Sequence, residues 1–122
     1  MIGYVTIGSN DLERAKPFYD AVFAPLGGRR IFANDRLQFW AARGQPGMIA
    51  VGQPYDGETA TSGNGSMFGL AASSNELVEQ VHAAAIAAGA ACEGEPGQRT
   101  ETFYGAYFRD LDGNKLCVFK LG

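Results

Sequence analysis

The feature that most constrains this fold is a pattern that occurs twice along the chain. A strand-like run, a helix-like run and further strand-like runs fill residues 1–52, and the same order returns in residues 67–122. An offset of 63 residues superposes Tyr4 on Met67, Ile7 on Leu70 and Glu13 on Glu76. One such unit is too small to bury its sheet and helix alone. We therefore expect an α+β fold of two βαβββ modules, which pair into a curved, mixed-sheet barrel with the helices outside.

The first module is expected to begin with a strand at residues 2–8, whose side chains alternate in character. Asn10 followed by Glu13 is typical of a helix N-terminus, and the glycines at 27 and 28 predict its end. Pro17 lacks an amide hydrogen, so we expect a kink there. Three short strands are predicted at residues 29–33, 36–42 and 48–51.

The second module ends in the clearest turn signal of the chain. Asp112-Gly113-Asn114 lies between two apolar runs, which is typical of a β-hairpin. Ser73 to Glu76 reads as a capping box, and Gly89 ends the helix that follows it. Strands are predicted at residues 67–72, 91–94, 103–109 and 115–121.

Residues 53–66 are polar, rich in glycine and without periodicity, so we interpret them as a linker between the modules. Gly63-Asn64-Gly65 does not qualify as a phosphate-binding loop, because such a loop opens a helix and a strand-like run follows here. The resulting organisation is a single domain over residues 1–122, with module one at 1–52 and module two at 67–122.

Length and net charge limit the classes of partner that the protein is expected to bind. A chain of 122 residues fits one domain, and a net charge of −3 without a basic cluster argues against nucleic acid and anionic membranes. Small molecules are the expected partners. No signal peptide is recognised at the N-terminus, so a cytoplasmic location is expected. Cys92 and Cys117 are then expected to be free thiols.

The run from Phe108 to Phe119, with Arg109-Asp110-Leu111-Asp112-Gly113-Asn114 at its start, resembles the last hairpin of the vicinal oxygen chelate superfamily. This superfamily includes glyoxalase I, extradiol dioxygenases and bleomycin-resistance proteins. The resemblance covers the whole chain and is closest to glyoxalase-like members. Further matching segments are Val5-Thr6-Ile7-Gly8, Asp11-Leu12-Glu13-Arg14, Phe18-Tyr19-Asp20-Ala21, Gly63-Asn64-Gly65 and His82-Ala83-Ala84-Ala85.

The resemblance implies where a metal would bind. In metal-using relatives, histidine and acidic or amide ligands come from inward positions on strands one, four, five and eight. Tyr4, Met67 and Cys117 occupy three of these positions here, and strand four offers only Met48. A divalent ion needs imidazole or carboxylate, so we expect no cofactor and no metal; a soft copper(I) site of Met67 and Cys117 is disfavoured. The alternative is a divalent metal such as Zn, Ni, Mn or Fe.

No catalytic residue is identified. His82 is the single histidine and lies on the second helix, from which it is not expected to reach Cys117 as a dyad. It is interpreted as a packing or surface residue. The apolar neighbours of Cys117 predict a raised thiol pKa unless a cation lies close, with Arg36 and Arg109 as the nearest candidates.

Strand alternation suggests a pocket lined by aromatic side chains and a few hydrogen-bonding groups. A plain core is the alternative, because periodicity alone does not separate the two. We expect a binding protein for a small apolar or aromatic compound, and the resemblance implies a homodimer. The alternatives are a metal-dependent lyase, similar to lactoylglutathione lyase, or a dioxygenase, and a structural interaction protein. The pocket candidates are Tyr4, Thr6, Gln38, Trp40, Met67, Tyr107, Cys117 and Phe119.

Overall fold

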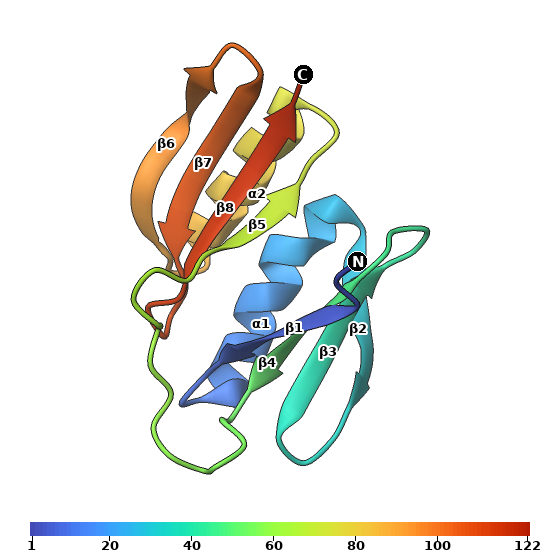
Figure 1. The fold of residues 1–122 in the computed structure, drawn as a ribbon, viewed down its shortest axis with the longest axis vertical. Helices are drawn as coiled ribbons and strands as arrows, with labels where there is room; N and C mark the ends of the chain where they lie inside the picture. Colours follow the sequence, from blue (N-terminus) through green and yellow to red (C-terminus); the bar gives the residue numbers. More distant parts are fainter.

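The computed structural model describes all 122 residues and contains the two predicted βαβββ modules (Figure 1). Module one consists of β1 (Tyr4–Gly8), α1 (Leu12–Phe23), the short 3-10 helix η1 (Ala24–Leu26), β2 (Gly28–Ala33), β3 (Leu37–Ala42) and β4 (Met48–Gly52). Module two consists of β5 (Phe68–Ala71), α2 (Asn75–Ala87), β6 (Ala91–Thr100), β7 (Phe103–Arg109) and β8 (Lys115–Leu121). Neither helix has the length and hydropathy needed to cross a lipid bilayer.

Each module forms its own four-stranded sheet, with the orders β1-β4-β3-β2 and β5-β8-β7-β6. The pairs β1·β4 and β5·β8 are parallel. In each module the last strand lies beside the first strand and runs in the same direction. All other pairs are antiparallel. The sheets are curved, but they do not close into the barrel that the sequence suggested.

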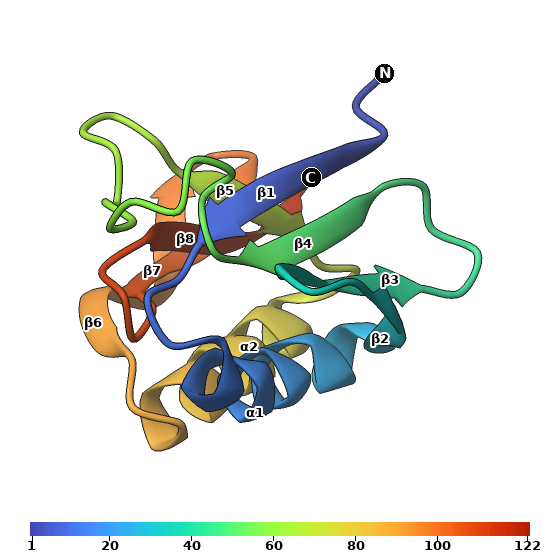
Figure 2. The same cartoon turned by 90° about the horizontal axis from the view of Figure 1, so that it is seen from below.

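Both helices lie in one layer beneath the two sheets, which form an arch over them (Figure 2). The main core lies between this layer and the sheets, and it draws on both modules. We call the opposite face of each sheet, on the outside of the arch, its open face. The core residues are Ile7, Ala15, Phe18, Tyr19, Val22, Phe23, Trp40, Val51, Leu70, Val78, Val81, Ala85, Ala106, Phe108, Leu116 and Val118.

The helix starts differ slightly from the prediction. Asp11 caps α1 by accepting a hydrogen bond of 3.2 Å from the amide of Arg14, a role that the sequence analysis gave to Asn10. Asn10 instead exchanges two hydrogen bonds with the backbone of Ala60, at 3.1 and 2.7 Å, and so fastens the linker. Ser74 caps α2 through the amide of Leu77. The helix α1 continues past Pro17 to Phe23.

Strand β6 extends to Thr100, six residues beyond the predicted end at Gly94. The sequence did not predict these additional strand residues, because glycine, proline and charged residues such as those around Pro96 are rare in strands. They are tolerated here since β6 is an edge strand, where proline costs no ladder hydrogen bond on the outer side. The register shifts between Cys92 and Gly94, and again before Gly97, so the strand contains bulges.

The buried carboxylate of Asp110 joins the two modules. It accepts hydrogen bonds from the Tyr19 hydroxyl, from the amides of Asp112 and Asn114 at 2.9 and 2.8 Å, and from the Asn114 side chain at 2.9 Å. Asn114 also donates to the carbonyl of Gly8 at 2.9 Å. Burial, reinforced by Asp110, raises the pKa of Tyr19 well above its usual value, so the hydroxyl stays a donor at neutral pH.

We predict that Asp110→Ala lowers the free energy of unfolding by about 3 kcal/mol or more, because several buried donors lose their acceptor together. Urea denaturation measures the change. The control is Asp35→Ala at an exposed turn, which we expect to cost about 0.5 kcal/mol or less. Equal losses in the two variants would contradict the role given to Asp110.

Candidate functional site

The open face of module two carries an aromatic platform. The rings of Phe103 and Phe119 stack with centroids 5.3 Å apart and planes 11° from parallel. They lie over glycines: a Cβ at Gly105 would come within 2.6 Å of the Phe103 ring, and one at Gly69 within 3.1 Å of the Phe119 ring. Because Gly69 and Gly105 have no side chains, the two rings can pack directly against the backbone of the sheet.

Tyr107 adds a third ring to this platform, between two cations. The guanidinium of Arg99 and the ammonium of Lys115 each lie 5.5 Å from its ring centroid, within the range of a cation–π interaction. Glu93 is paired with Lys115 at 3.5 Å and with Arg109 at 3.0 Å. Arg99 has no acidic partner, so the platform carries a surplus of positive charge.

Cys117 lies directly opposite Tyr107 in the β7–β8 register and is 1% exposed. Burial raises the pKa of the Cys117 thiol, and Tyr107, Arg99 and Lys115 offset this only in part. Burial likewise raises the pKa of Tyr107. Both groups are therefore neutral near pH 7, and Cys117 is not an activated nucleophile. The cations near it are Arg99 and Lys115; the sequence pointed to Arg36 and Arg109.

Module one has an apolar open face of its own. The Phe32 and Phe39 rings stack at 4.3 Å, and Tyr4 packs edge-on against Phe39 at 5.6 Å. Tyr4 and Phe32 remain 55% and 53% exposed, so this aromatic cluster is uncovered in the single chain. Phe32 and Phe39 were absent from the predicted pocket, although alternation along β2 and β3 could have placed them together.

The prediction was wrong for Trp40 and Gln38, which lie on the helix side of β3. The Trp40 indole donates to Asp20 on α1 at 2.9 Å and contacts the rings of Tyr19 and Phe23. Gln38 is buried on the same side and donates to the Phe32 carbonyl at 3.0 Å. Strand β3 is apolar on both faces, so its alternation gives no hydrophobic contrast from which to choose a side.

Asp20 holds this edge of module one together. Its two carboxylate oxygens accept hydrogen bonds from Arg30 at 3.0 and 2.7 Å, in addition to the bond from Trp40. Partial burial raises the pKa of Asp20, but the Arg30 and Trp40 hydrogen bonds and the Arg30 charge outweigh this and leave the pKa below its usual value. Asp20 is thus a structural anion away from the open faces.

The remaining pocket candidates are divided between the two open faces. Tyr4 and Thr6 lie on module one; Tyr107, Cys117 and Phe119 lie on module two, and Met67 lines the hollow at the border of their platform. The open-face ring contacts stay within each sheet. The outside of the arch turns the two faces away from each other (Figure 2). One chain therefore carries these candidates on two separate surfaces and does not bring them into one pocket.

Two hollows on the surface of the chain are polar and open. One, of about 470 Å³, lies between the start of α1 and the linker, beside Asp35 and Arg36. The other, of about 510 Å³, lies between linker residues 62–66 and Met67, Arg109 and Lys115, at the border of the module two platform. The second hollow extends the platform toward cationic side chains.

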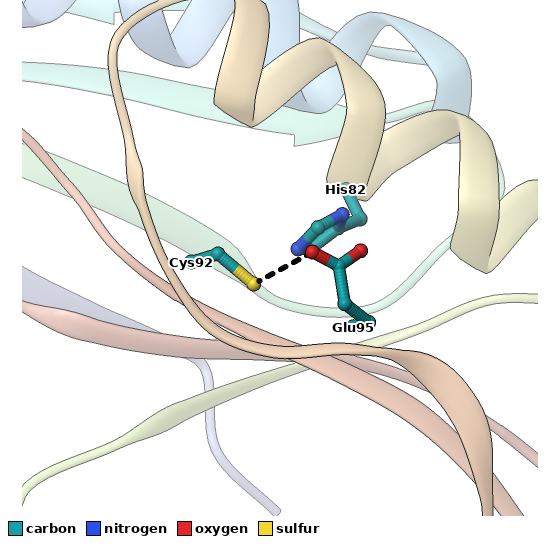
Figure 3. Close-up of side chains that lie close together, drawn as sticks. All are labelled: His82, Cys92 and Glu95. Carbon is teal, nitrogen blue, oxygen red and sulfur yellow. Dashed lines mark hydrogen bonds between the residues drawn. The ribbon is translucent and has the colours of Figure 1, made fainter.

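A separate group of potential ligands lies on the helix side of module two (Figure 3). His82 on α2, Cys92 and Glu95 on β6 each offer one ligand atom, and these atoms lie within 4.8 Å of one another. His82 is 5% exposed, and its Nε2 has no hydrogen-bond partner. Burial lowers the pKa of His82, partly offset by Glu95. The structure thus places His82 beside Cys92; the sequence missed the group because β6 was predicted to stop before Glu95.

We predict that iodoacetamide modifies Cys92 but spares Cys117 in the folded protein, because Cys92 is exposed and Cys117 is buried with a raised thiol pKa. Intact-mass measurement should show one adduct, which peptide mapping assigns to Cys92. The Cys92→Ser variant is the control and should show none until denaturant is added. Rapid double labelling of the native protein would contradict the buried position of Cys117.

Comparisons with known proteins agree with this architecture. Residues 1–118 match the family model described as the Glyoxalase/Bleomycin resistance protein/Dioxygenase superfamily. A comparison with curated proteins gives no significant match. A glyoxalase/bleomycin resistance protein from Albidiferax ferrireducens is 40% identical, with a TM-score of 0.92 over 100% of this chain and 99% of that one.

A second solved structure supports the fold alone. It is a glyoxalase/bleomycin resistance protein/dioxygenase family enzyme from Burkholderia phytofirmans, with 22% identity and a TM-score of 0.80 over 98% of each chain. The family match over nearly the whole chain, together with the paired βαβββ modules, decides the assignment. The chain belongs to the glyoxalase/bleomycin resistance protein/dioxygenase superfamily.

Proposed function

We propose that this protein binds a small aromatic or apolar compound, preferably one with an anionic group, and that it does so without a metal at the family's inherited positions. The observation that carries the proposal is the platform of Phe103, Phe119 and Tyr107 on the open face, with the unpaired cation of Arg99 beside it. Flat apolar rings are held by such a surface, and a guanidinium selects carboxylate or phosphate groups on them.

The side chains at the inherited positions do not suit the metal chemistry of the family. Tyr4, Met67 and Cys117 supply a phenol, a thioether and a thiol that burial keeps protonated. Lewis-acid catalysis by a borderline divalent ion uses imidazole and carboxylate ligands. A binding role fits these residues better than a lyase or dioxygenase reaction.

We further propose that two copies of the chain complete each site. Each chain exposes two half-sites that turn outward, and their apolar side chains include Tyr4, Phe32, Met67 and Leu121, all about half exposed or more. Exposed clusters of this kind are typical of interaction surfaces. In a two-fold symmetric dimer, module one of one copy would face module two of the other. The facing sheets would enclose two equivalent ligand sites.

Ligand binding is tested by a thermal-shift screen of aromatic carboxylates and their neutral analogues, thiol conjugates and antibiotics. We expect aromatic anions to raise the melting temperature more than their neutral analogues, because ligand affinity adds directly to stability. Arg99→Gln and Phe119→Ala should each weaken binding about tenfold, the loss of one charge-assisted or stacking contact. The control Arg43→Gln, at an exposed turn of module one, should bind normally. A panel that stabilises nothing would contradict the binding function.

The proposed dimer is tested by light scattering coupled to size-exclusion chromatography. We expect the mass of two chains for the natural protein and of one chain for Phe32→Glu, because a carboxylate in the exposed aromatic cluster opposes its burial. Ile86→Glu is the control, since Ile86 is also exposed and apolar but lies on α2. A natural protein that is monomeric at micromolar concentration would contradict the pairing, and ligand binding by that monomer would leave the binding function standing.

A further inference from the structure

We propose that His82, Cys92 and Glu95 form a site for one borderline divalent cation of the zinc class, on the helix side of module two and separate from the open face. The site would join the edge strand β6 to helix α2, because His82 comes from the helix and the other two ligands come from the strand. None of the three residues occupies a position that the family resemblance assigns to a metal ligand.

The distances suit a small cation. The three ligand atoms lie within 4.8 Å of one another, and the Cys92 Sγ is already 3.4 Å from a carboxylate oxygen of Glu95. Tetrahedral zinc, bound at about 2.0–2.3 Å, holds its ligand atoms roughly 3.5 Å apart. Cys92 and Glu95 are exposed and can rotate, so a shift of about 1 Å at their tips closes the site.

A bulge in β6 creates this arrangement. Residues three apart in a regular strand point to opposite faces of the sheet, which would separate Cys92 from Glu95. The register of β6 against β7 advances by two residues between Cys92 and Gly94 while β7 advances by one. This extra residue turns Glu95 to the same side as Cys92, toward His82 (Figure 3). Bulges re-aim side chains in this way beside functional sites.

The buried His82 nitrogen is the independent observation that points to a ligand. His82 is 5% exposed, and its Nε2 is the one buried side-chain nitrogen or oxygen of the chain without a hydrogen-bond partner. A buried polar atom left unpaired is costly, and native structures seldom keep one without a reason. Figure 3 shows the imidazole directed at Cys92 and Glu95, where a cation would accept its lone pair.

The donor set selects the class of cation. One imidazole nitrogen, one thiolate and one carboxylate suit zinc and its analogue cobalt, whereas magnesium and calcium prefer oxygen ligands alone. Binding releases the Cys92 thiol proton to solvent, so each bound cation displaces about one proton. A water molecule can fill the fourth position, because the strand side of the site faces solvent.

This site changes the expectation of a metal-free protein that the sequence supported. That expectation was drawn from Tyr4, Met67 and Cys117 on the open faces, which still lack suitable ligands. His82, Cys92 and Glu95 lie on the other side of the module two sheet, so a cation held there acts as a fastener between β6 and α2 and leaves the open face to the organic ligand.

The test is cobalt(II) titration of the full chain after its metals are removed with a chelator. We expect a thiolate-to-cobalt absorption band in the near ultraviolet and visible bands of a tetrahedral ion, saturating at about one cobalt per chain. Zinc should abolish the spectrum by displacement and should slow the alkylation of Cys92. Absence of a thiolate–cobalt band at micromolar cobalt would overturn the proposal.

Matched variants locate the site. Cys92→Ser and Glu95→Gln change exposed side chains, and each should weaken cobalt binding by about 100-fold or more, beyond the loss typical of an outer-sphere partner. Cys117→Ser tests the other thiol and Glu93→Gln tests the neighbouring carboxylate, which pairs with Arg109 across the sheet; both should bind cobalt normally. His82→Gln tests the third ligand, and circular dichroism checks that this variant is folded. Cobalt spectra that survive Cys92→Ser or vanish in Cys117→Ser would refute the assignment.

Discussion

The buried carboxylate of Asp110 is the interaction on which the rest of the structure depends. It gathers donors from α1, through Tyr19, and from the β7–β8 turn, while Asn114 carries the network on to the end of β1. A buried charge of this kind is tolerated only when its hydrogen bonds are complete, so the turn, the helix and the first strand must adopt one mutual arrangement. This arrangement packs the two modules around a shared core and sets the helices in one layer.

The shared helix layer determines where the open faces of the two sheets point. Because α1 and α2 pack together beneath both sheets, the opposite faces of the sheets point outward, and each carries its own aromatic cluster. Glycines at 69 and 105 seat the Phe119 and Phe103 rings, which a Cβ at either position would crowd. Asp110 and Asn114, two residues of the family-like run, therefore maintain the frame, whereas Phe119 of the same run belongs to the open-face platform.

Module two presents different chemical groups on the two faces of its sheet. The open face presents rings and an unpaired guanidinium, which suits a flat organic anion. The helix side presents imidazole, thiol and carboxylate around an unsatisfied buried nitrogen, which suits a cation. The sheet between them keeps the two groups apart, so the metal site proposed at His82 and the ligand surface proposed near Tyr107 do not share side chains.

The sequence by itself determined the two βαβββ modules, the hairpin at Gly113 and the terminal strands, because these rest on local turn chemistry and on repeated patterns. It also placed Cys117 and Phe119 on one face of β8 and Tyr107 on the same side of β7, because successive side chains of a strand point to opposite faces. The tertiary structure alone decided that Trp40 faces α1, because β3 is apolar on both sides and only packing selects the side. The tertiary structure also brought Glu95 close to His82. This depends on the bulge in β6, which arises from the pairing of β6 with β7 and has no local sequence signal.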